Sequence, residues 1–159
     1  IEALGPEFIR AVLLLSCGRP DLAALPLVEL PESDPLVCFE RARAAHSMGL
    51  PRIALLALQQ FAQRAGGHHR IRRLHTAVFA AQMALACGEQ EHALELLRAA
   101  PIRLIGGRPL ILFAKLLADA GEVQEACALL RDNLERDPEH TRAAQLLTRL
   151  EHPTGDAHA

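Results

Sequence analysis

Apolar residues recur along the chain at the spacing of amphipathic helices, with short breaks between them. In EVQEACALLRDNLERD (122–137), one apolar helix face is formed by Val123, Ala126, Leu129, Leu130 and Leu134. Acidic residues begin this segment and Arg136 stands near its end, which is the order that the helix dipole favours. The preceding segment, 108–120, also predicts a helix, with Pro109 in its first turn. Gly121 lies between the two and predicts the joint of a helix pair, because Gly readily adopts the left-handed conformation that ends many helices.

The same arrangement recurs, since a Gly followed five positions later by an Ala occurs four times. The copies read CGRPDLA (17–23), MGLPRIA (48–54), CGEQEHA (87–93) and AGEVQEA (120–126), and their Gly residues are 31, 39 and 33 positions apart. Repeats of this length are typical of helical arrays. The repeated Ala is expected where two helices cross closely and leave little room for a side chain. A predicted break also follows each Gly by 17 residues, at or beside Pro35, Gly66, Ile105 and Pro138.

These breaks predict helix pairs at roughly 4–34, 35–67, 68–107 and 108–137, and a final helix at 138–151. We predict a single domain over 1–151 and a disordered polar tail over 152–159. Pro26 lies inside the second helix of the first pair, so this helix is predicted to be short or kinked.

The first turn and the cysteines carry further predictions. Leu13–Ser16 is predicted to be the buried end of the first helix, with Cys17 and Gly18 in the turn. The four cysteines, at 17, 38, 87 and 127, form no CxxC pair and lie in apolar helical contexts. They are therefore predicted to act as small buried apolar residues.

On these residues the chain resembles the tetratricopeptide repeat (TPR) family, in which helix-turn-helix units of about 34 residues stack on one another. The fourth unit is the most similar, with a small residue at Ala114, Gly121 at the turn, Ala126 in the second helix and Pro138 at its end. The resemblance covers roughly residues 4–151. It implies an all-α fold, a right-handed superhelical array of about four antiparallel helix pairs and a C-terminal helix.

The resemblance also implies a partner-binding groove, because arrays of this family bind ligands on the concave face that the first helices line. The corresponding positions are Phe8, Val12 and Leu15 in the first unit, Phe39, Arg43 and His46 in the second, His75, Val78 and Gln82 in the third, Arg108, Ile111 and Lys115 in the fourth, and Arg142, Gln145 and Arg149 in the final helix. Such a groove is apolar at its N-terminal end and basic toward its C-terminal end. It would suit a peptide with an apolar segment followed by acidic residues or a free carboxylate. The alternative is that Arg43, Lys115 and Arg149 only solvate one face.

A second possible contact is the basic segment GGHHRIRRLH (66–75), which contains His68, His69, Arg70, Arg72, Arg73 and His75. Nucleic-acid binding usually involves a broader positive surface and, for single strands, stacking aromatic residues. The spacing of the histidines does not match a metal site. We therefore favour a solvated helix start, with contact to an acidic protein surface as the next alternative.

Composition narrows the functional classes. The 159 residues are 50% hydrophobic with a net charge of −2, which suits a packed core and gives no global field for nucleic acid or an anionic membrane. No apolar run approaches the length of about 18 residues that a membrane span needs. Signatures such as GxSxG, HExxH and a phosphate-binding Gly loop are absent, so we expect no catalysis, cofactor or metal. A single Lys among 17 basic residues indicates a GC-rich bacterial source, and we expect a cytoplasmic protein, or a periplasmic one if a signal preceded Ile1.

We therefore expect a non-catalytic module, an adaptor, chaperone or scaffold, that binds a partner peptide or helix in the apolar-to-basic groove. The first alternative is a sensory or oligomerisation domain of a larger bacterial regulator. The second is nucleic-acid binding through the basic segment. The first helix, FIRAVLLLS (8–16), is apolar nearly all round, so we expect a partner, a missing segment or a second copy to cover it.

Overall fold

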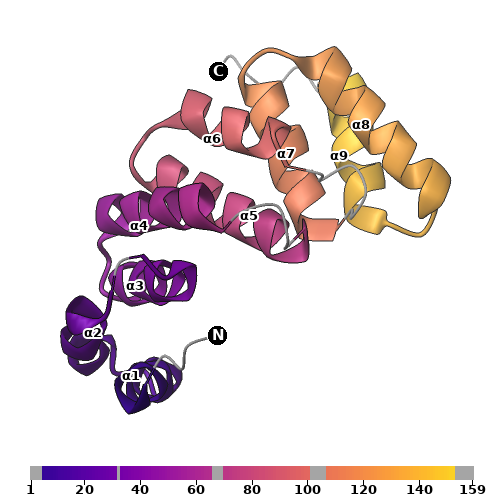
Figure 1. Ribbon diagram of the computed structural model, residues 1–159. Helices are drawn as coiled ribbons and strands as arrows, with labels where there is room; N and C mark the ends of the chain where they lie inside the picture. The colour runs from indigo at the N-terminus through magenta and orange to yellow at the C-terminus, as the bar shows by residue number, and fades with distance from the viewer. Residues whose placement is uncertain (1–4, 32, 66–69, 101–106, 153–159) are drawn as a thin grey trace. The chain divides into compact units, whose positions relative to one another are not determined.

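The computed structural model describes residues 5–31, 33–65, 70–100 and 107–152, which form helices joined by turns (Figure 1). The helices in these ranges are α1 (Pro6–Ser16), α2 (Pro20–Glu29), α3 (Pro35–Ser47), α4 (Pro51–Arg64), α5 (Arg70–Ala86), α6 (Gln90–Arg98), α7 (Gly107–Asp119), α8 (Val123–Arg136) and α9 (Thr141–Glu151). These ranges contain no strand, which confirms the predicted all-α fold. No helix within them is both long and apolar enough to cross a membrane. The predicted tail lies outside these ranges beyond His152.

The chain divides into two compact units, Ile1–Leu96 and Leu97–Ala159, and the division falls within α6. In the first unit each helix from α1 to α4 packs against the next helix in the chain, and α1 also contacts α3. In the second unit α8 packs against both α7 and α9, and α7 also contacts α9. Helices therefore pack mainly on their neighbours in sequence, as expected for stacked repeats.

Four of the turns between helices have the same construction, built on the recurring Gly. Gly18, Gly49, Gly88 and Gly121 have φ angles of +71°, +72°, +80° and +85°. At the fourth turn, the amide of Gly121 donates to the carbonyl of Ala118 at 3.0 Å, and the amide of Glu122 donates to that of Leu117 at 2.8 Å. The same two bonds close the other three turns. This Schellman motif satisfies carbonyls that a helix end would otherwise leave unpaired, and it confirms the predicted role of the Gly.

The recurring alanines mark the crossing of the paired helices. Ala23, Ala54, Ala93 and Ala126 are each 0% exposed. A larger side chain at such a position would push the two helices apart or strain their side chains. Their complete burial is what the predicted close crossing of the paired helices requires.

Helix α2 is the short second helix that Pro26 predicts. It has 10 residues, against 14 each in α4 and α8, although α6 is shorter still, with 9 residues and no proline. Arg41 on α3 caps the C-terminal end of α2. Its guanidinium donates hydrogen bonds to the carbonyl oxygens of Leu27, Val28 and Leu30 at 2.9, 3.1 and 3.1 Å. A cation at a helix C-terminus also suits the helix dipole. Arg41 therefore ties the first helix pair to the second.

The final helix begins later than predicted. Helix α9 starts at Thr141 and not at Pro138, because 137–140 form a turn in which the amide of His140 donates to the carbonyl of Asp137 at 3.2 Å. The His140 ring then accepts a hydrogen bond from the amide of Ala143 at 3.1 Å and caps the helix. His is not among the usual capping residues, so this helix start could not be predicted from the residue types.

Two predictions of burial are wrong. Leu13 is 59% exposed and Ser16 is exposed, because α2 and α3, the helices that pack closely on α1 among those described, do not cover these residues. Cys38 and Cys127 are buried as predicted, whereas Cys17 is exposed and Cys87 is half-buried. Both of these cysteines lie in a turn that ends a helix, where the chain leaves the core.

Replacing Gly121 by Ala is expected to destabilise the protein by about 1 kcal/mol, because a residue with a Cβ is strained in the left-handed conformation. No heavy atom lies within 4 Å of the place where that Cβ would stand, so the loss reports on the backbone alone. Urea unfolding followed by circular dichroism measures it. Gly121→Asn is the matched control and should lose less, because Asn tolerates this conformation better. Equal losses for Ala and Asn would contradict the backbone explanation.

Candidate functional site

In the first unit, the residues predicted to line the groove lie on three first helices. They are Phe8, Val12 and Leu15 on α1, Phe39, Arg43 and His46 on α3, and His75, Val78 and Gln82 on α5. The α1 set is apolar and half-buried, as are Phe39 and Val78. His46, His75 and Gln82 are exposed.

In the second unit, the predicted residues lie on α7 and α9. They are Arg108, Ile111 and Lys115 on α7, and Arg142, Gln145 and Arg149 on α9. Ile111 is half-buried and the other five are exposed. Residues three and four positions apart share one side of a helix, so each set forms a stripe.

The cations of the second unit fall into two groups. Arg98, Arg131 and Arg136, on α6 and α8, each pair with a carboxylate: Arg98 with Glu122 and Glu125, Arg131 with Glu151, and Arg136 with Asp132. The cations of α7 and α9 have no such partner among the described residues: Arg108, Lys115, Arg142 and Arg149. Within this part of the chain, the unpaired positive charges therefore all belong to the first helices.

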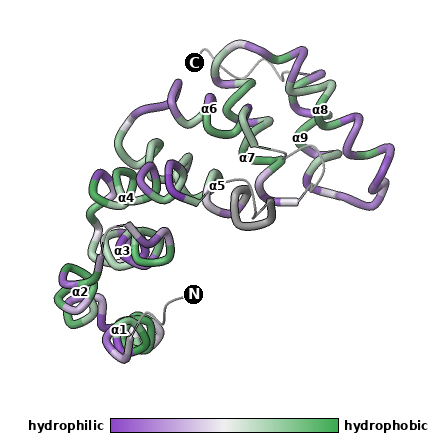
Figure 2. Tube along the Cα trace, in the orientation of Figure 1, coloured by the Kyte–Doolittle hydropathy of each residue, from purple (hydrophilic) through white to green (hydrophobic). Residues whose placement is uncertain are grey.

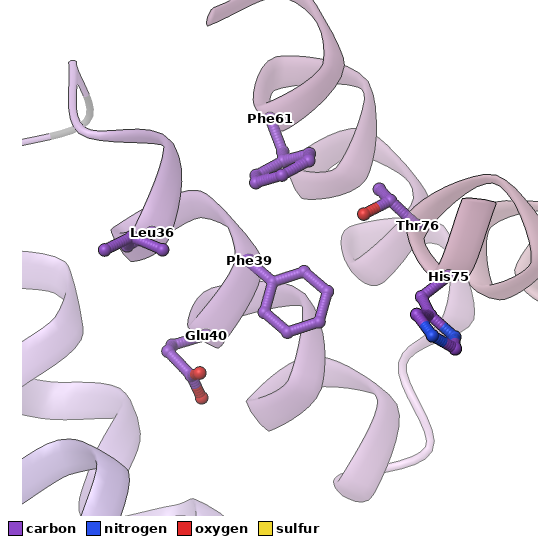
Figure 3. Close-up of a pocket in the computed structure, with 6 residues that line it drawn as sticks. All are labelled: Leu36, Phe39, Glu40, Phe61, His75 and Thr76. Carbon is purple, nitrogen blue, oxygen red and sulfur yellow. The ribbon is translucent and has the colours of Figure 1, made fainter. Parts of the chain in front are cut away.

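A pocket of about 340 Å³ lies between α3, α4 and α5 in the first unit (Figure 3). It is lined by Leu36, Phe39, Glu40, Phe61, His75 and Thr76. Figure 3 shows the Phe39 side chain in the middle of this group. Phe39 and His75, which the sequence assigned to different repeat units, are thus brought to one site.

Aromatic rings extend from the pocket along the first unit. The ring centre of Phe39 lies 5.7 Å from that of Phe61 and 6.4 Å from that of Phe79, and Phe79 lies 5.3 Å from the ring of His46. All three pairs are tilted or edge-to-face, which are favourable arrangements for rings. Sequence reasoning missed Phe61 and Phe79. The available signal was scarcity, since the chain has five Phe and no Trp or Tyr.

The pocket also contains a buried carboxylate that the sequence analysis missed. The Glu40 side chain is 12% exposed, and its Oε2 lies 2.7 Å from Nη1 of Arg43. Burial raises the pKa of Glu40 above its ordinary value, although the charge and the hydrogen bond of Arg43 act in the opposite direction. The other carboxylate oxygen accepts no hydrogen bond from the described residues. Arg43, predicted as a groove cation for the partner, is therefore already engaged by Glu40.

Most of the basic segment 66–75 lies outside the part of the chain that the structure describes. His68 and His69 lie outside the described residues, and so do the side chains of Arg70, Arg72 and Arg73. His75, the last residue of the segment, lines the pocket. Among the described residues, no group of three or more His, Cys, Asp or Glu could hold a metal ion.

The fold matches proteins of known structure that are built from TPR-like repeats. MamA from Desulfovibrio magneticus RS-1, residue 41 to the end, matches 97% of this chain and 89% of its own length, with a TM-score of 0.75 and 17% identity. A chain of the APC/C hetero-tetramer Cut9–Hcn1 matches 91% of this chain with a TM-score of 0.68 and 16% identity, and the present chain spans 29% of its length. No family model and no curated protein matches the sequence. The structural likenesses confirm the predicted TPR-like helical-repeat fold.

Replacing Glu40 by Gln is expected to stabilise the protein at neutral pH. Because the folded state raises the pKa of Glu40, folding favours its protonated form, and the stability of the wild type falls as the pH rises through the folded pKa. Gln carries no charge and removes this loss. The gain should be about 0.5 kcal/mol at pH 7. It should disappear near pH 3.5, where an ordinary Glu is mostly protonated as well.

Urea unfolding of both proteins at the two pH values measures this difference. The control is Glu135→Gln on the exposed side of α8, which should change stability at neither pH. If Glu40→Gln lowers the stability at pH 7, the attraction between Glu40 and Arg43 outweighs the cost of burial, and the assigned balance is wrong.

Proposed function

We propose that this protein is a non-catalytic interaction module that binds a peptide or helix of a partner protein along the exposed sides of its first helices. The TPR-like fold supports a role in protein binding, since stacked helix pairs present extended surfaces. In the first unit, α1, α3 and α5 would contact apolar residues of the partner. In the second unit, the cations of α7 and α9 would contact its acidic residues.

One observation in the second unit supports this proposal most directly. The cations of α6 and α8 form ion pairs with carboxylates, whereas those of α7 and α9 form none with the described residues. A cation whose role is to stabilise the fold finds a carboxylate, as Arg98, Arg131 and Arg136 do. Arg108 and Arg142 also stand at the second position of their helices, where the helix dipole disfavours positive charge. Their placement costs stability, and an acidic partner would offset that cost.

Selection of short random peptides displayed on phage tests the proposed chemistry. Wild-type protein is expected to enrich Asp and Glu over the input library, and binding of the selected peptides should weaken with added salt. Arg108→Glu combined with Arg142→Glu should lower the affinity for these peptides about tenfold, because two exposed charge contacts become repulsive.

The control is Arg131→Glu combined with Arg136→Glu, which makes the same change in net charge on α8. It should retain the selected peptides at near wild-type affinity. If both double variants lost the same affinity for the selected peptides, the effect would come from net charge and not from the positions of Arg108 and Arg142. A selection without acidic enrichment would refute the acidic half of the proposal.

The exposed side of α1 supports a second function, self-association. Five residues before each repeated Gly stand Leu13, Ala44, Met83 and Leu116. Ala44, Met83 and Leu116 are 3–4% exposed, whereas Leu13 is 59% exposed. Ala44 packs in one core cluster with Ala11 and Leu27 of the preceding helix pair, and the described residues before α1 contain no helix that could cover Leu13 in this way.

Further apolar residues of α1 and α2 are exposed, and they favour a second copy as the cover of this helix pair. Ile9 on α1 is 59% exposed, and Leu25 and Val28 on α2 are each 72% exposed. Figure 2 shows apolar stretches along both helices in green. The exposed side of α9 is polar, with Thr141, Arg142, Gln145, Thr148 and Arg149. A second copy would therefore match the α1 side with its own α1 side, in a closed two-fold contact.

Leu13→Glu is expected to abolish this self-association without unfolding α1, because the side chain is already mostly exposed. Light scattering coupled to size-exclusion chromatography should show the wild-type mass rising toward that of a dimer with concentration, and the variant should stay monomeric. Val123→Glu, which replaces a residue that is 38% exposed on α8, is the control and should behave as wild type. A wild type that is monomeric at every concentration would rule out the dimer.

A further inference from the structure

The second helices of the later pairs contact one another through charged residues. Arg98 on α6 stands ten residues after its repeated Gly, and it pairs with Glu122 and Glu125, which stand one and four residues after the next Gly. Between α4 and α6, Arg52 lies 3.7 Å from Glu89, the residue before α6. Where two second helices meet in these pairs, the exposed positions are therefore charged.

The corresponding positions of α2 and α4 are apolar. Val28 stands ten residues after the first repeated Gly, and Leu50 and Ile53 stand one and four residues after the second. These residues are 72%, 41% and 54% exposed, and Leu56, three residues further along α4, is 60% exposed. Because equivalent residues of stacked repeats occupy equivalent places, we expect Val28 to face Leu50 and Ile53. We call these four residues the outer apolar patch.

The stacking of the repeats does not require apolar residues in the outer apolar patch, since charged residues occupy the same positions in the later pairs. Exposed apolar residues that gather in one place usually mark a surface that another molecule covers. Leu50, Ile53 and Leu56 are spaced by three residues, so they form one ridge along α4. The outer apolar patch is therefore a candidate docking surface on the second helices.

A helix suits this surface better than an extended segment. The backbone groups of α4 are hydrogen-bonded within the helix, so the ridge offers no backbone donor or acceptor to an incoming chain. An extended segment that buried its side chains here would remove water from its own amides without replacing those hydrogen bonds, which is costly. An amphipathic helix satisfies its backbone internally and buries one apolar side.

Arg52 distinguishes a different protein from a second copy as the source of this helix. It precedes Ile53, its side chain is 82% exposed, and it donates no hydrogen bond to the described residues. A two-fold contact centred on Ile53 would bring the Arg52 side chains of two copies close together, and their charges would repel. An acidic residue beside the apolar side of the incoming helix would instead be attracted to Arg52.

We propose that the outer apolar patch binds an amphipathic helix of a partner protein, with its apolar side on Val28, Leu50, Ile53 and Leu56 and an acidic residue toward Arg52. This site is separate from the groove proposed above, because it lies on second helices and the groove lies on first helices. It also differs from the two-fold contact through α1, because three of its four apolar residues belong to the second helix pair.

The probe is a synthetic peptide of about 18 residues, or five helical turns, with Leu along one side and Glu beside it. The matched control peptide has Pro at two central positions, which breaks the helix. Fluorescence anisotropy of labelled peptides measures their affinity for the 159-residue protein carrying Leu13→Glu, so that self-association through α1 does not compete. The helical peptide is expected to bind at least about tenfold more tightly than the control. Equal binding would overturn the helical occupant.

Val28→Arg combined with Ile53→Glu introduces the charges that Arg98 and Glu125 supply in the later pairs, and leaves the net charge unchanged. In the same background, this variant is expected to stay folded and to bind the helical peptide about tenfold more weakly. Its melting temperature, followed by circular dichroism, should exceed the value that the two single variants predict by addition, because the new charges face each other. Additive effects would show that the two residues do not share one patch and would overturn the site.

The control variant is Val123→Arg combined with Ala128→Glu, which places the same two charges on exposed positions of α8. It should bind the helical peptide with unchanged affinity, and an equal loss in both double variants would overturn the location of the site. Arg52→Glu should weaken binding of this peptide and strengthen binding of a version with Lys in place of Glu. Unchanged affinities for both versions would overturn the role of Arg52.

Light scattering on the Leu13→Glu protein tests whether a second copy takes the place of the partner helix. This protein is expected to be monomeric at every concentration, with or without the changes at Val28 and Ile53. A dimer that persists in Leu13→Glu and dissociates when Val28→Arg and Ile53→Glu are added would assign the patch to a second copy and overturn the proposal.

Discussion

The close crossing of two helices behind a left-handed Gly is the constraint on which the rest of the structure depends. At Gly121 the backbone reverses within a few residues, because φ of +85° directs the chain out of α7 and two hydrogen bonds hold it there. Ala126 on α8, five residues further on, has no exposed surface, and α8 packs against α7. Since this geometry fixes which residues of each helix face inward, it also fixes which side of the first helix is left to solvent.

The solvent-exposed side of each first helix can hold residues that folding does not require. In the second unit, the helices α6 and α8 use their arginines for ion pairs within the fold, and α7 and α9 do not. The same logic applies to the end of an array. Leu13 occupies a position that is buried in each later pair, so its exposure depends on which element covers α1 and not on the composition of its helix.

The sequence predicted the features that depend on local backbone chemistry, such as the Gly turns, the buried Ala positions and the short helix containing Pro26. It failed where the outcome depends on which element covers a residue. FIRAVLLLS is apolar nearly all round, so periodicity could not show that Leu13 faces outward. Phe61 and His75 line one pocket with Phe39 only after three helices have packed. The Glu40–Arg43 pair has a spacing of three residues and was visible in the sequence, but its burial was not.

Comparison of equivalent positions shows what the fold needs at the position of Glu40. Nine residues before each repeated Gly stand Ile9, Glu40, Phe79 and Leu112, so three of the four first helices have an apolar residue there. An apolar residue at the Glu40 position would thus satisfy the packing of the array. A carboxylate at that position loses water and gains one hydrogen bond, and the burial that raises its pKa disfavours its charged form. The ion pair with Arg43 is the contact within the described residues that offsets this cost.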